Sequence, residues 1–181
     1  MPEKGDNAIM KLARALGVFE KYMQLRLQTY PHPVLGNCTL NIGTFHGGSA
    51  NNIVPDSARA QLDIRVTPQL YQAGGALELL ENVIREMALP LQLTYAHENP
   101  PMDTPIDHPI LQLLLLSRPG AKPVGAPWFS DAAHLSRRGI PSICLGPGSI
   151  DQAHTADEFI KVDDLLAGVK HFSRFISMLK R

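Results

Sequence analysis

The most constraining feature of the sequence is a strict alternation of apolar and polar residues between positions 58 and 66. Successive side chains of a strand point to opposite faces, so this pattern predicts a strand with one buried and one solvent-facing surface. A chain with such a strand must supply an apolar layer to cover it. The apolar residues are Ala58, Ala60, Leu62, Ile64 and Val66, and the polar ones are Arg59, Gln61, Asp63 and Arg65.

The elements around this strand predict a ferredoxin-like unit. Asp6 or Asn7 is a suitable cap for a helix running to about residue 28, and a strand follows over residues 39–45. Thr67 and Pro68 open a second helix, and residues 91–95 form another strand. This order is a βαββαβ sandwich without its first strand, so the chain is expected to begin inside a domain. The expected buried face of the second helix is Leu77, Leu80, Ile84 and Met87.

A polar, proline-rich stretch at residues 98–103 predicts a hinge, which divides the chain into domains 1–98 and 99–181. The second domain is α/β in character, with helices expected over residues 108–117 and from Ser130, and a buried strand over 141–145. The last helix is expected to be capped by Asp163. Its apolar side consists of Leu166, Val169, Phe172, Ile176 and Leu179.

Composition excludes several classes of protein. The 181 residues contain 17 Lys and Arg and 17 Asp and Glu, so the net charge is zero and nothing favours nucleic acid or an acidic membrane. The longest apolar run, residues 110–116, is too short to cross a bilayer, and the polar opening residues do not resemble a signal peptide. Cys38 and Cys144 have no metal-type spacing and are expected to be reduced core residues. These features predict a soluble cytoplasmic protein.

The segment 141–158 is the best candidate for a functional site. Its apolar strand ends in a turn containing Gly146 and Gly148, and His154 follows six residues later. A rigid strand that ends in a glycine turn is a common support for a reactive side chain. His154 is a possible metal ligand with Glu158 as its supporting partner, or it helps to cap the next segment. A zinc site needs three or four ligands, and the sequence offers one at this position.

Other candidates have equally plausible structural roles. His46, beside two glycines, is either a hydrogen-bond donor to a ligand or a solvated loop residue. Arg65, on the polar face of its strand, either clamps a carboxylate or is an ordinary surface residue. A hydrolase triad of Ser130, Asp131 and His134 is disfavoured, because the chain has no Gly-x-Ser-x-Gly motif.

Six segments, taken in order, resemble the zinc-dependent amidohydrolases and peptidases that include aminoacylase, acetylornithine deacetylase and succinyl-diaminopimelate desuccinylase. The resemblance covers essentially the whole chain, and the run from Leu145 to His154 is most similar to acetylornithine deacetylase. The six segments are residues 2–9, 46–55, 62–65, 129–132, 139–141 and 145–158.

The resemblance implies a catalytic domain with two zinc ions, interrupted by a βαββαβ lid that forms a homodimer. Residues 1–98 then match the lid without its first strand, and residues 99–181 match the C-terminal part of the catalytic domain. His154 falls on the last zinc ligand of the family. Asn52 and Arg65 fall on lid positions that face the substrate and bind its carboxylate, and Gly148 lies in the turn that lines the pocket.

The family's other functional residues have no counterpart in this sequence. These are a His-x-Asp segment, a bridging Asp, a Glu-Glu pair that includes the catalytic base, and a lid histidine. No catalytic residue is therefore assigned. The intact protein is expected to hydrolyse the amide bond of an N-acyl amino acid or small peptide, while this chain alone is expected to be inactive. The alternative is a non-catalytic module that self-associates through its long helix and the strand at residues 39–45.

Overall fold

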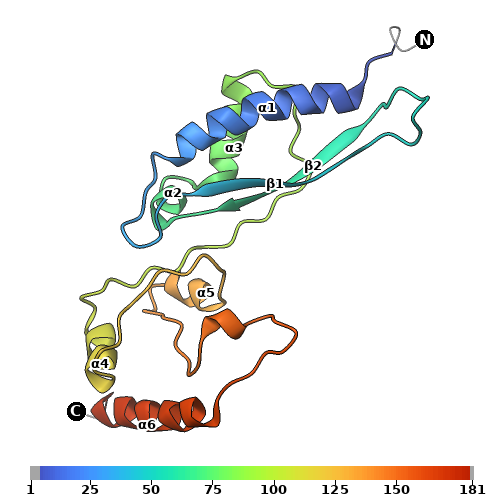
Figure 1. The fold of residues 1–181 in the computed structure, drawn as a ribbon. Helices are drawn as coiled ribbons and strands as arrows, with labels where there is room; N and C mark the ends of the chain where they lie inside the picture. Colours follow the sequence, from blue (N-terminus) through green and yellow to red (C-terminus); the bar gives the residue numbers. More distant parts are fainter. Residues whose placement is uncertain (1–4, 180–181) are drawn as a thin grey trace. The chain divides into compact units, whose positions relative to one another are not determined.

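A computed structural model describes residues 5–179, and the chain forms two compact units (Figure 1). The first contains Met1–Pro101 and Gly125–Phe129, and the second contains Met102–Val124 and Ser130–Arg181. Most of the polar turn expected at the start lies outside the described residues. The fold is mixed α and β, as predicted. No helix within residues 5–179 combines the length and apolarity needed to cross a membrane.

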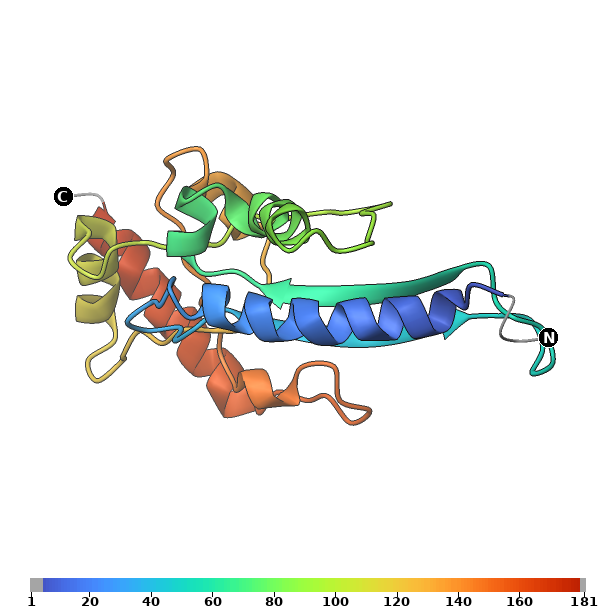
Figure 2. The same ribbon diagram turned by 90° about the horizontal axis from the view of Figure 1, so that it is seen from above.

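The first unit begins with the expected long helix and hairpin. Helix α1 (Ala8–Leu27) is capped by Asn7, whose Oδ1 accepts a hydrogen bond of 3.0 Å from the Met10 amide. Strands β1 (Thr39–Gly47) and β2 (Ala58–Arg65) pair antiparallel, with an irregularity between Ile42 and Thr44. The alternating exposure of β2 confirms the predicted pattern. Figure 2 shows α1 running along this hairpin.

The predicted second helix is divided in two. Helix α2 (Pro68–Gln72) begins after Thr67 as expected, but α3 (Gly75–Glu86) is separate. The break follows from Gly74 and Gly75, whose φ angles of 113° and 87° are left-handed. Of the predicted face, Leu80 is buried and Ile84 packs half-buried against the core, whereas Leu77 is half-buried and Met87 is exposed. The buried residues of α3 are Gly75, Ala76, Leu79, Leu80 and Val83.

The core of the first unit lies between α1, α3 and the hairpin. Phe19, Met23 and Val83 are at most 1% exposed. At the edge of this core, Arg26 on α1 forms an ion pair of 2.8 Å with Glu86 on α3. The hydrogen bond with Tyr22 and the charge of Glu86 raise the pKa of the Arg26 guanidinium, which keeps it charged.

Two predicted strands are not formed. Residues 91–95 and 141–145 have no regular secondary structure, and the only sheet among residues 5–179 contains β1 and β2. Leu91 and Leu93 nevertheless pack on the core. Alternation in a sequence identifies the buried face of a strand, but a strand also needs a hydrogen-bonded neighbour. In the second unit, the side chain of Thr104 replaces a small part of the strand hydrogen bonding that residues 141–145 lack. Thr104 Oγ1 donates to the Ser142 carbonyl at 2.6 Å and accepts from its amide at 3.0 Å.

In the second unit, the described residues up to 179 form three α-helices, and these regions were largely predicted. They are α4 (Pro109–Ser117), α5 (Ala132–Ser136) and α6 (Val162–Leu179). Because α6 starts at Val162, Asp163 lies in its first turn instead of capping it. Ser117 on α4 donates to the Leu114 carbonyl, so its Oγ accepts from His171 Nε2 on α6 at 2.7 Å.

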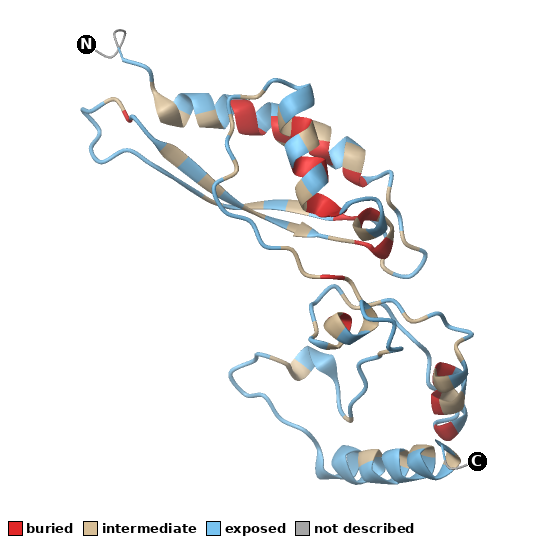
Figure 3. Cartoon of the chain, turned by 180° about the vertical axis from the view of Figure 1, so that it is seen from behind, coloured by how far each residue is buried: buried red, intermediate tan, exposed pale blue. Residues whose placement is uncertain are grey.

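Fewer apolar residues are buried in the second unit than in the first among residues 5–179. The apolar side of α6 exists, but none of the helix residues is buried (Figure 3). Phe172 is 37% exposed and Leu166 is 54% exposed. The expectation that both cysteines are core residues was correct for Cys38 and wrong for Cys144, which is exposed.

Thr67 links the start of α2 to the segment after α1, and we expect its hydroxyl to be important for stability. The side chain is 3% exposed. Its Oγ1 donates to the Tyr30 carbonyl at 2.8 Å and accepts from the Leu70 amide at 3.3 Å. Thr67→Val leaves both groups without this partner, and should lower the free energy of unfolding by about 1–3 kcal/mol in urea denaturation. Thr67→Ser retains the hydroxyl and should lose less. Equal losses in both variants would contradict the hydrogen-bonding role.

Glu98 acts as a cap for α3, although it lies outside the helix. The N-cap residue Gly74 has no side chain to accept a hydrogen bond, and the Ala76 amide instead donates to Glu98 Oε1 at 2.7 Å. Glu98→Ala should lower the free energy of unfolding by about 1 kcal/mol and accelerate hydrogen exchange at the Ala76 amide. Glu81→Ala on the same helix removes an exposed carboxylate without this contact and is the control. Unchanged exchange in Glu98→Ala would exclude a capping role.

Candidate functional site

His154 lies in an exposed loop between the Gly148 turn and helix α6. The 3₁₀ helix η2 (Ile150–Gln152) precedes it, with Ser149 Oγ accepting from the Asp151 amide at 3.2 Å. His154 itself has a φ of 62°, an uncommon left-handed conformation for a residue other than glycine. Its amide donates to Glu158 Oε2 at 3.2 Å. Glu158 therefore holds the backbone of the candidate ligand in place, whereas the sequence had predicted that it supports the ring.

The Gly148 turn is held against neighbouring segments of the second unit. Gly148 has a φ of 83°, and a Cβ at this position would lie 3.4 Å from Ile160 Cγ1. On the other side of the turn, a Cβ at Gly168 on α6 would lie 3.0 Å from Pro147 Cβ. Two glycines thus allow the turn to lie close to Ile160 and α6. The structure places His154 a few residues beyond this anchored turn.

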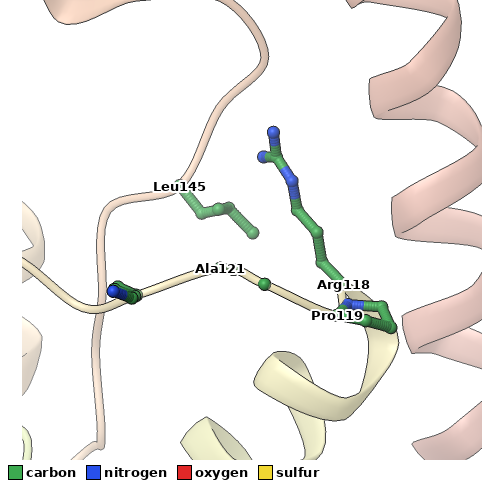
Figure 4. A pocket seen from close by; sticks show the side chains of 6 residues that line it. Arg118, Pro119, Ala121 and Leu145 are labelled. Atoms are coloured by element: carbon green, nitrogen blue, oxygen red, sulfur yellow. The ribbon is translucent and has the colours of Figure 1, made fainter.

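A shallow hollow of about 450 Å³ lies beside Leu145, just before the turn (Figure 4). Its other lining residues belong to the segment after α4, where Arg118 and Lys122 supply two positive charges. Two cations beside an apolar side chain suit an organic anion such as a carboxylate. Sequence reasoning did not identify this pair. The signal was the two basic residues on either side of the Pro119–Gly120 turn.

In the first unit, Asn52 and Arg65 are far apart. Asn52 is exposed in a turn of the loop between β1 and β2, whereas Arg65 is the last residue of β2. The strand has eight residues, which at ~3.3 Å per residue separates its ends by roughly 20 Å. Within one chain, these two residues therefore lie at different points of the hairpin.

Arg65 is partly engaged by its own unit. Its Nε lies 2.7 Å from Asp63 Oδ2, and its Nη1 donates to the Pro127 carbonyl at 3.4 Å. A guanidinium has five N–H donors, so donors remain for a carboxylate. The side chain is 55% exposed, and this exposure makes it accessible to a ligand. Both roles considered for Arg65 are compatible with these contacts.

The remaining candidates have local roles. His46 lies in β1 opposite Arg59 and is exposed. Ser130 Oγ accepts from the Ala132 amide at 3.3 Å, at the start of α5. Asp131 occupies the N-cap position, and its side chain makes no capping hydrogen bond. These contacts explain Ser130 as a helix-start residue and add nothing in favour of a triad.

The residues present do not make a metal centre by themselves. Within residues 5–179, no three His, Cys, Asp or Glu side chains are grouped so that they could hold a metal ion. Structural and catalytic zinc sites use three or four protein ligands. His154 alone does not fit zinc, so this chain by itself supports no reaction step through a metal.

Comparison with known proteins identifies the family. Residues 1–92 match the peptidase dimerisation domain, and the chain belongs to this family. It is 32% identical to acetylornithine deacetylase from Klebsiella pneumoniae (strain 342) and 31% identical to that from Salmonella arizonae. Each similarity covers 88% of this chain and 43% of the relative. The chain therefore spans less than half the length of these relatives.

A solved structure supports the same fold. The M20 family metallo-carboxypeptidase Sso-CP2 from Sulfolobus solfataricus aligns with 98% of this chain and 43% of its own, with a TM-score of 0.62. Sequence identity in this alignment is 23%, so the similarity concerns the fold alone. The resemblance inferred from the sequence is thus confirmed at the level of the family, and the lid-type fold at the level of architecture.

The left-handed turn before His154 provides a test of the loop geometry. Gly148→Ala places a side chain in a left-handed conformation, which costs about 1–2 kcal/mol. Gly146→Ala is the matched control, because Gly146 has no left-handed φ and a Cβ there would meet nothing within 4 Å. Hydrogen exchange of the second unit should therefore accelerate in Gly148→Ala and stay nearly unchanged in Gly146→Ala. Equal behaviour of the two variants would refute the assigned turn.

Proposed function

We propose that this chain forms part of a metal-dependent hydrolase that cleaves the amide bond of an N-acyl amino acid or small peptide. The observation that carries the proposal is similarity to acetylornithine deacetylases over 88% of the chain. We assign residues 1–98 to the lid and residues 99–181 to a C-terminal portion of the catalytic domain. Its cytoplasmic location, expected from the sequence, is part of the same proposal.

In this proposal, each candidate residue has a defined task. His154 is one metal ligand, held by the Glu158 contact to its backbone, and Gly148 shapes the wall of the substrate pocket. Arg65 uses its remaining donors for the substrate carboxylate, and Asn52 faces the substrate from the loop of the hairpin. Metal ions bound in the intact protein would supply Lewis-acid chemistry, and of this chain's residues only His154 would help to hold one. In this proposal, the other metal ligands and the catalytic base are supplied by parts of the longer protein beyond these 181 residues.

The alternative proposal is a self-associating module without catalysis. The observation in its favour is that the family match is to a dimerisation domain and covers residues 1–92. This part of the chain also contains a well-buried core of its own. Under both proposals, the first unit forms a homodimer, and the two proposals differ in whether residues 99–181 take part in hydrolysis.

The hydrolase proposal predicts no turnover by the 181-residue chain on its own. We expect no zinc-dependent release of ornithine from N-acetylornithine, because one imidazole does not fix a metal ion in a defined geometry. Zinc titration by calorimetry should show weak binding of similar strength in the unmodified chain and in the control His46→Ala. Only His154→Ala should weaken this zinc binding. Zinc-dependent hydrolysis that is lost in His154→Ala would show that the chain is a complete enzyme.

The longer protein tests the same residues in their proposed context. In a protein that contains this chain together with the remaining length of its relatives, His154→Ala should abolish hydrolysis and Arg65→Ala should mainly raise KM. Normal hydrolysis in the His154→Ala variant would refute the hydrolase assignment of this residue. A longer protein that dimerises and never hydrolyses an acyl amino acid would favour the module.

A further inference from the structure

Asp63 forms an ion pair with Arg65 on the polar face of β2. The two residues are two positions apart in the strand, so their side chains project from the same face of the hairpin. Asp63 Oδ2 lies 2.7 Å from Arg65 Nε, and both side chains are 55% exposed. An ion pair with this exposure contributes little to stability. The hairpin therefore does not depend on Asp63 for its folding.

A second segment of the first unit contacts the same guanidinium. Arg65 Nη1 donates to the Pro127 carbonyl at 3.4 Å. Pro127 belongs to residues 125–129, which are part of the first unit although the chain on both sides of them belongs to the second. The guanidinium is thus restrained at two of its nitrogens by two segments that are distant in the sequence.

Gly125 determines how closely this segment approaches the rest of the first unit. A Cβ on Gly125 would lie 2.8 Å from Leu35 Cδ2 and 2.9 Å from the Val34 carbonyl oxygen. Glycine permits this approach because it has no side chain. Pro127 follows two residues later, so the close packing at Gly125 places the carbonyl that accepts from Arg65.

The cross-strand neighbours of the ion pair carry no charge. The partner of Asp63 in β1 is Asn41, and the partner of Arg65 is Thr39. Within residues 5–179, neither Asp63 nor Arg65 forms another ion pair. Asp63 therefore has one cationic partner. Arg65 keeps N–H donors that no group of this chain uses, because a guanidinium has five.

We infer that Asp63 is a positioning residue, which holds the Arg65 guanidinium so that its unused donors bind the carboxylate of an N-acyl amino acid, with the Pro127 carbonyl as the second restraint. This inference rests on the proposed function, which assigns the substrate carboxylate to Arg65. A flexible arginine side chain loses conformational freedom when it binds a ligand, and a restrained one loses less. A planar guanidinium held in one orientation also matches the two oxygens of a carboxylate.

The negative charge of Asp63 makes this inference easy to contradict. Asp63 repels an incoming carboxylate, so a residue that only competed for Arg65 would weaken binding. A positioning residue strengthens binding in spite of this repulsion. Asp63→Asn keeps the size of the side chain and removes its charge, so the direction of the change in affinity distinguishes the two roles.

The first test measures carboxylate binding by the full 181-residue chain through the NMR signal of the Arg65 Nε–H group. The ligand is N-acetylglycine, and N-acetylglycinamide, which has no carboxylate, should leave the signal unchanged. The dissociation constant for N-acetylglycine should rise roughly three- to fivefold in Asp63→Asn. Asp63→Glu keeps the carboxylate and should lose less. Asp56→Asn is the matched control, because Asp56 is exposed and forms no ion pair within residues 5–179.

The second restraint is tested with Gly125→Ala. The added Cβ cannot fit against Leu35 and Val34 without a shift, which should move the Pro127 carbonyl away from Arg65 and weaken binding of N-acetylglycine. Gly146→Ala is the control, because a Cβ there would meet nothing within 4 Å. Normal affinity in Gly125→Ala would overturn the role of the Pro127 carbonyl.

The longer protein separates positioning from a structural role. In that protein, Asp63→Asn should raise KM for N-acetylornithine and leave kcat nearly unchanged, because the ion pair acts on carboxylate binding alone. Unchanged or tighter carboxylate binding in Asp63→Asn would overturn the inference and leave the proposed function intact. An unmodified chain whose Arg65 signal does not respond to N-acetylglycine would overturn the proposed role of Arg65, and this inference with it.

Discussion

Burial of one face of α1 is the interaction on which the first unit depends. Phe19, Met23 and Leu27 occupy the space above the hairpin, and Val83 of α3 closes it from the side. Fully burying side chains of this size contributes about 1.5–3 kcal/mol each. With only two hydrogen-bonded strands, the sheet has few ladder bonds of its own. The packing of α1 and α3 therefore stabilises the two strands, and the hairpin in turn positions the two helices.

Local patterns in the sequence were sufficient for α1, β1 and β2. The cap at Asn7 and the alternation from Ala58 to Arg65 depend on near neighbours only, and the structure retains both. The break between α2 and α3 was missed because a single glycine is tolerated in a helix, whereas Gly74 and Gly75 together adopt left-handed angles. The start of α3 then decides which residues face the core. Leu79 and Val83 are buried, whereas Leu77 is half-buried and Ile84 packs half-buried at the edge of the core.

Features that depend on distant parts of a protein were harder to predict. Residues 91–95 and 141–145 have the apolar character of strands, but the sequence does not show which segment would pair with them. The same applies to α6, whose apolar side is correctly described and yet exposed. At the candidate site, the roles of His154 and Gly148 stay predictions, drawn from the residue pattern and the family resemblance. Residue patterns did not predict the left-handed backbone of His154, because residues other than glycine seldom adopt it. Glu158 was expected to support the ring of His154, and it accepts from the backbone amide instead.

The two cysteines illustrate how similar sequence surroundings lead to different chemistry. Cys38 is buried, and its sulfur accepts the Thr67 amide at 3.4 Å, so the thiol belongs to the hydrogen-bonded interior. Cys144 is exposed and unpaired. Thiols that reach solvent are oxidised first. In air, oxidation would therefore begin in the second unit. Disulfides between the Cys144 thiols of two molecules would form, while the packing around Cys38 would remain intact.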